Sequence, residues 1–112
     1  MTRYLIEHIP VPQAAAAVIK NPQDRTEAIR TIFESVGGRL EHYYIAYTEN
    51  TIYLLGEIPD QESLAALMTA IWASGVSMSL KAKALMTATE AVDVYKKAGT
   101  VGYRPPTAYL GA

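Results

Sequence analysis

The side chains of this chain that could do chemistry are carboxylates, lysines and tyrosines on segments with the character of β-strands. Glu7 lies in the first of these segments, and Lys81 and Lys83 lie in the last. If these two strands are neighbours, the carboxylate and the ammonium groups meet across them. Such a group could bind a polar ligand or give a carboxylate a shifted pKa, and the simpler alternative is an exposed cross-strand ion pair.

Four tyrosines lie close together in the middle of the chain, at positions 43, 44, 47 and 53. They could stack on an aromatic ligand and offer hydroxyl groups to it. Tyrosine is also enriched where subunits pack, so the same cluster fits an interface between copies. Glu57 follows Tyr53 by four residues and is a second carboxylate that could act as a general base.

The histidines, cysteines and short motifs predict no metal and no cofactor. His8 and His42 are expected on separated strands and facing away from their neighbours Glu7 and Glu41, which is poor geometry for a shared metal ion. The chain has no cysteine, which excludes disulfides, zinc–cysteine sites, iron–sulfur clusters and thiol chemistry. It also lacks a phosphate-binding loop, a nucleophile elbow and a dinucleotide fingerprint.

Composition predicts one globular domain with an ordinary hydrophobic core. The chain has 112 residues, of which 50% are hydrophobic and 19% are charged. The formal net charge of -1 argues against nucleic acid and membrane surfaces as partners, since proteins that bind them usually carry a basic excess. Because no apolar run approaches the roughly 20 residues of a membrane span and the N-terminus lacks the pattern of a signal peptide, we expect a cytoplasmic protein.

Hydrophobic periodicity and breaking residues divide the chain into strands and helices. Strands are expected at residues 4–9, on both sides of a turn at 48–50, and at 76–85. An alanine-rich helix is expected at 13–20, and a longer one begins with Asn21 as N-cap and ends at Gly37-Gly38. Asp60 should cap the next helix, and a capping box at Thr87 should open a last helix that runs to residue 98.

This order, βαββαβ followed by one helix, predicts an α+β fold of the ferredoxin-like type. Right-handed crossovers place the strands in an antiparallel sheet of order 4-1-3-2, and both long helices then cover the same face. We therefore expect a domain at residues 1–98 and an extended tail at 99–112. The apolar tail residues, such as Tyr109 and Leu110, suggest an arm that crosses to a neighbouring subunit or caps the mouth of the barrel, or else a disordered end.

Alternation along the strands predicts the residues on each face of the sheet. The helix side is expected to carry Tyr4, Ile6, Ile52, Leu54, Met78, Leu80 and Ala82. The uncovered side is expected to carry Leu5, Glu7, Ile9, Glu41, Tyr43, Ile45, Tyr47, Tyr53, Leu55, Glu57, Lys81 and Lys83. Its apolar members form a larger patch than a monomer usually exposes, so we expect this face to pack on a second copy about a two-fold axis.

Several short segments of the chain resemble the GYD-domain family. They are Ile19-Lys20 with Pro22 and Arg25, Gly37-Gly38, Tyr44, Glu57 with Pro59-Asp60, Leu85-Met86-Thr87 with Glu90, and the segment from Val101 to Pro106. The Gly-x-Tyr-Asp signature of the family would align with Thr48-Glu49-Asn50-Thr51, which retains none of the three signature residues. Pro12 and Ala15 replace a usual threonine and glycine. The resemblance implies a dimeric α+β barrel and no established activity.

Three functions are compatible with these observations. The first is an oligomeric small-molecule-binding domain, which holds its ligand between two facing sheets without a cofactor. Its predicted ligand-binding residues are Glu7, Tyr43, Tyr53, Glu57, Lys81 and Lys83. The second is a cofactor-independent enzyme of the monooxygenase or isomerase type, acting on an aromatic or enolisable substrate with Glu7 or Glu57 as the base. The third is a structural or assembly protein with a dry interface between sheets.

Overall fold

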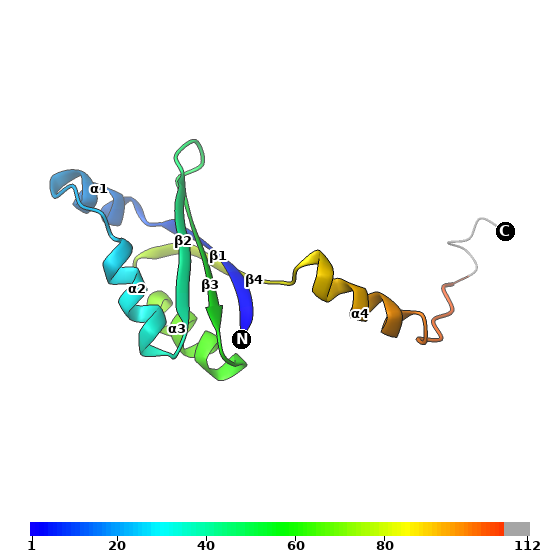
Figure 1. The fold of residues 1–112 in the computed structure, drawn as a ribbon. Coiled ribbons are helices and arrows are strands. Elements are labelled where there is room, and N and C mark those ends of the chain that lie inside the picture. The colour runs from blue at the N-terminus through cyan, green and yellow to red at the C-terminus, as the bar shows by residue number, and fades with distance from the viewer. Residues whose placement is uncertain (107–112) are drawn as a thin grey trace.

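The structure is a computed structural model, and it describes residues 1–106. Its strands and helices follow one another in the predicted order (Figure 1). The strands are β1 (Thr2–Pro10), β2 (Arg39–Ala46), β3 (Thr51–Ile58) and β4 (Ser77–Leu85). The helices are α1 (Pro12–Lys20), α2 (Thr26–Ser35), α3 (Gln61–Ala73) and α4 (Ala88–Ala98). Among the described residues, no helix is long and apolar enough to cross a membrane.

The four strands form one antiparallel sheet in the order β2-β3-β1-β4, which confirms the predicted strand order and the ferredoxin-like arrangement. The first strand is therefore central, with Glu7 directly opposite Tyr53 on one side and Lys81 on the other. The two edges of the sheet are β2 and β4. This placement of β1 next to β4 is what brings the predicted carboxylate and lysines together.

The core lies between the sheet and the two helices α2 and α3, which pack on the same face. Phe33 of α2 and Leu67 of α3 are buried against the sheet. Their buried partners on the strands are Ile6, Leu40, Leu54 and Ile58. The aromatic ring of Phe33 lies against Gly56, where an added Cβ would come within 2.6 Å of that ring. Glycine in β3 thus makes room for the largest buried side chain.

A β-bulge in β2 corrects the predicted face of two residues. Leu40 pairs with Gly56, and the next regular pair is His42 with Leu55, so Glu41 is an extra residue in the ladder. After the bulge the alternation of β2 is reversed. Tyr43 therefore pairs with Leu54 and packs against the core on the helix side, and Ile45 pairs with Ile52. The predicted positions of Tyr43 and Ile45 on the uncovered face are wrong. The expectation that His42 faces away from Glu41 is wrong as well, because the bulge places both side chains on the uncovered face.

The starts of α3 and α4 coincide with their predicted capping groups. Asp60 accepts a hydrogen bond from the Ser63 amide, and Thr87 with Glu90 forms the predicted capping box of α4. The predicted start of α2 at Asn21-Pro22 is wrong, since the helix begins at Thr26. There the Asp24 side chain accepts bonds from both the amide and the hydroxyl of Thr26, which stabilises a turn ahead of the helix.

The remaining helices, α1 and α4, extend away from this body (Figure 1). All residues of α1 are at least partly exposed, and α4 projects from the end of β4 on the side of the sheet opposite α2. Within the predicted tail, residues 101–106 form no helix or strand. The tail residues Tyr109 and Leu110 lie outside the described residues.

Candidate functional site

The face of the sheet that α2 and α3 leave uncovered, which we call the open face, carries its side chains in ordered rows. One row places Arg3 between Glu57 and Leu85, with Arg39 beyond Glu57. The next row has a leucine pair at its centre and consists of Lys83, Leu5, Leu55 and His42. The third consists of Lys81, Glu7, Tyr53 and Tyr44. Each row of the open face therefore contains charged or polar side chains, and the leucine pair is the apolar centre of the second row.

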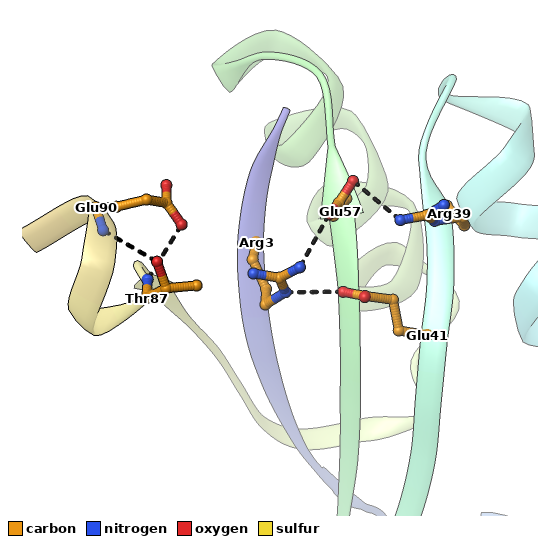
Figure 2. A network of polar contacts seen from close by, with 6 residues as sticks. All are labelled: Arg3, Arg39, Glu41, Glu57, Thr87 and Glu90. Carbon is orange, nitrogen blue, oxygen red and sulfur yellow. Dashed lines mark hydrogen bonds and ion pairs between the residues drawn. The ribbon is translucent and has the colours of Figure 1, made fainter.

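Four charged residues at one end of the open face form a continuous network, the Arg3 cluster (Figure 2). The Arg3 guanidinium donates from Nε to Glu41 Oε1 at 2.9 Å and from Nη2 to Glu57 Oε1 at 3.1 Å. Arg39 approaches the other oxygen of Glu57, with 3.4 Å between Nη2 and Oε2. Strands β1, β2 and β3 are thus linked through charged side chains on one face.

Within this cluster, the electrostatics favour the charged forms of Arg3 and Glu41. The hydrogen bond from Arg3 lowers the pKa of Glu41, although partial burial of the carboxylate opposes it. The same hydrogen bond raises the pKa of Arg3, with smaller contributions from the charges of Glu57 and Glu90. The carboxylates of Glu41 and Glu57 are each only 22% exposed although the face has no cover. The hydrogen bond between Arg3 and Glu41 therefore stabilises the charged forms of these two groups.

The third row borders a depression of about 160 Å³ in the open face. Its lining combines carboxylate, ammonium, phenol and hydroxyl groups and consists of Glu7, Ile9, Glu49, Thr51, Tyr53, Ser79 and Lys81. Lys83 pairs with Glu7 at the rim, with 3.3 Å between Nζ and Oε2. Glu7 is the more enclosed residue of this pair: its side chain is 21% exposed, whereas that of Lys83 is 61% exposed.

The structure brings together four of the six predicted ligand-binding residues. Glu7, Tyr53 and Lys81 line the depression, and Lys83 contacts Glu7. Glu57 belongs instead to the Arg3 cluster and lies four residues along β3 from Tyr53, which is about 13 Å. Tyr43 lies on the other face, where burial raises its pKa.

Several residues of the open face were not predicted as site residues. Arg3 has the same parity as Leu5 and Glu7 in the first strand, so the alternation itself could have identified it. Arg39 sits at the start of β2 with the parity of Glu41. Ser79 lines the depression from β4 and has the parity of Lys81, so the alternation could have identified it as well. Glu49 lines the depression from the β2–β3 turn, and only the three-dimensional arrangement places it there.

The two histidines lie on opposite faces of the sheet. His42 is exposed on the open face, where its ring stacks on Tyr44 with 5.7 Å between ring centroids. His8 lies on the helix side, where its Nε2 atom is buried and has no hydrogen-bond partner among the described residues. Burial lowers the pKa of His8, and a hydrogen bond with the backbone of Val76 opposes this shift. Within residues 1–106 no three His, Asp or Glu side chains are grouped to hold a metal ion.

Comparison with known families decides the relationship of the chain. The model of the GYD domain matches residues 4–94, which include β2, β3 and β4 and most of β1 and α4. The chain belongs to the GYD-domain family. No curated protein and no solved structure matches it significantly. Residues 4–94 of this GYD-domain protein contain the whole depression, and the match begins one residue after Arg3 of the Arg3 cluster.

Proposed function

We propose that this GYD-domain protein is a homo-oligomeric small-molecule-binding domain, which holds its ligand between the open faces of two facing sheets. The observation that carries the proposal is the depression lined by Glu7, Tyr53 and Lys81 on a face that has no cover within the described chain. Polar groups of opposite charge and an aromatic ring converge there. Such convergence is typical of sites that orient a small ligand.

The size of the depression supports a site shared between copies. Ligand pockets for drug-sized molecules usually enclose about 300–1,000 Å³, and this depression is about 160 Å³. A second sheet placed over it would supply the missing wall and exclude water. The leucine pair Leu5 and Leu55 lies in the row beside the depression and gives the contact an apolar centre.

The lining indicates the kind of ligand. The ammonium groups of Lys81 and Lys83 can donate to an anionic or carbonyl oxygen, and the carboxylate of Glu7 can accept from a hydroxyl or amine. Tyr53 offers a ring for stacking and a phenol for a hydrogen bond. We therefore propose a small polar ligand with both donors and acceptors, and with a planar part that stacks on Tyr53. The binding site requires no cofactor.

Native mass spectrometry of the protein purified gently from its own host tests this function. We expect a dimer, or a multiple of it, that carries reproducible additional mass. Glu7→Gln should keep the oligomer and lose the additional mass, because it removes only the acceptor charge of the depression. An oligomer without additional mass in both proteins would contradict ligand binding and favour a structural role.

A charge placed at the centre of the open face tests the contact itself. Leu55→Lys should yield a folded monomer without additional mass, since the ammonium group would have to be buried between the sheets. Ala28→Lys adds the same charge at an exposed position of α2 and should leave the oligomer intact. A wild-type monomer at all concentrations would contradict the proposal for both the contact and the shared site.

A further inference from the structure

Helix α4 is amphipathic, and most of its apolar side faces solvent, with Ala91 as the one buried residue of the helix. At helical spacing its apolar residues fall on one side of the helix and its charged residues on the other. The apolar side consists of Ala91, Val92, Val94, Tyr95 and Ala98, and the charged side consists of Glu90, Asp93, Lys96 and Lys97. The side chains of Val92 and Val94 are each 46% exposed and that of Tyr95 is 71% exposed. A stable helix of this pattern normally buries its apolar side.

The overall dimensions of the chain show that it is more extended than a compact domain of the same length. The radius of gyration is 18.5 Å and the principal extents are 61 × 33 × 23 Å. A compact chain of this length would have a radius of gyration of about 13 Å. The difference arises where α4 leaves the end of β4 and extends away from the sheet (Figure 1). Helix α4 therefore lies where it can reach another molecule.

The same chain carries an apolar groove of suitable size on the other side of the sheet. This α3–β4 groove encloses about 270 Å³ and is lined by Met68, Thr69, Trp72 and Leu80. The large apolar side chain of Trp72 lines this groove and is nevertheless 57% exposed. The lining of the groove lacks charged groups that could orient a polar ligand. It suits apolar side chains of a protein segment.

We propose that α4 is an exchanged arm, whose apolar side docks in the α3–β4 groove of a second copy of this chain. The first reason is complementarity. The chain presents both a helix whose apolar side is mostly exposed and an apolar groove that is open in the described structure. About a two-fold axis each copy supplies both parts, so the contact forms twice.

The charges of α4 favour a protein partner over a lipid surface. Its charged side carries two acidic and two basic residues and is therefore neutral, whereas helices that lie on anionic membranes are rich in lysine and arginine. The position of α4 favours a second copy, since the arm projects on the side of the open face, where the partner sheet of the proposed dimer would lie. The exchange of arms does not depend on ligand binding.

Sedimentation equilibrium of two matched variants tests the arm. Tyr95→Glu places a charge on the apolar side of α4, and we expect it to raise the dissociation constant of the oligomer by about tenfold or more. Lys97→Gln changes the net charge by the same amount on the opposite side of the helix and should leave the constant unchanged. Equal constants for wild type and Tyr95→Glu would overturn the proposal.

Disulfide formation between engineered cysteines tests where α4 docks. The chain has no cysteine of its own that could interfere. Thr69→Cys and Val94→Cys are prepared as separate proteins, mixed and oxidised. We expect a disulfide-linked heterodimer, and much less of it when Lys97→Cys replaces Val94→Cys. A yield that does not differ between these two pairs would overturn the docking of α4 in the α3–β4 groove. That result would leave the sheet contact, which Leu55→Lys reads separately, untouched.

Discussion

At the scale of single residues, the open face depends on side chains that hold one another in place. Arg3 binds carboxylates from two other strands, and one of these strands, β2, is not its neighbour in the sheet. The guanidinium therefore reaches across β3 to Glu41. Its planar, forked donor group suits this geometry, and a lysine at the same position could not reproduce it.

The partly buried imidazole of His8, whose Nε2 atom is shielded from solvent, predicts a loss of stability in mild acid. Burial lowers its pKa in the folded state, so the unfolded chain binds the proton more readily. Its contribution to the free energy of unfolding is complete above about pH 6.5, decreases as the pH falls through that value, and levels off below the folded-state pKa. We therefore expect the urea concentration at the midpoint of unfolding to be lower at pH 5.5 than at pH 7.5.

A leucine at this position provides the comparison. His8→Leu should lose most of the difference between the two pH values, because no group titrates there. His42→Gln removes the exposed histidine of the opposite face and should retain the difference. If wild type and His8→Leu lose stability in parallel, the acid sensitivity does not come from His8.

At the scale of secondary-structure elements, Gly56 fixes how closely α2 and β2 approach β3. An added Cβ would lie 2.6 Å from both the Arg39 carbonyl oxygen and the Phe33 ring. Backbone and a buried ring cannot both move aside. We expect Gly56→Ala to lower the free energy of unfolding by about 1–3 kcal/mol, measured by chemical denaturation.

Gly102→Ala is the matched control for this change. No atom lies within 4 Å of a Cβ added at Gly102, so the free energy of unfolding should change by less than about 0.5 kcal/mol. Equal effects of the two substitutions would show that Gly56 is not required for the packing of Phe33.

The elements show which parts of the fold the sequence could predict. Capping groups at Asp60 and Thr87 and the alternation in β1, β3 and β4 are local signals, and the structure confirms the elements they define. The bulge at Glu41 has no such signal, because an extra residue in a strand is set by its pairing with the neighbouring strand. The prediction that Tyr43 and Ile45 lie on the uncovered face was therefore wrong.

The candidate site was predictable to the same extent. Glu7, Lys81 and Lys83 follow from alternation and strand order, since both depend on patterns along the chain. Glu49 could not be predicted as a lining residue, because its position depends on how the β2–β3 turn curves over the face. Glu7 pairs with Tyr53, and Glu57 lies four residues further along the same strand. Glu7 and Glu57 therefore lie too far apart for the single site that was predicted.

At the scale of the whole molecule, self-association should appear in the stability of the protein. If the open face is buried only in the oligomer, dilution shifts the equilibrium towards the unfolded chain. We expect the thermal midpoint to rise with protein concentration over about a hundredfold range, and calorimetry measures this directly. Leu55→Lys should have a lower midpoint that does not depend on concentration. A constant midpoint for the wild type would argue for a self-sufficient monomer.

The projecting helix α4 also determines how the protein moves through solution. A particle with extents of 61 × 33 × 23 Å experiences more friction than a sphere of the same 12.2 kDa mass. A single copy would leave a gel-filtration column earlier than globular standards of equal mass and could be mistaken for a pair. An exchanged arm would fold this length into a more compact pair. Shape and mass must therefore be measured independently, by sedimentation velocity together with light scattering.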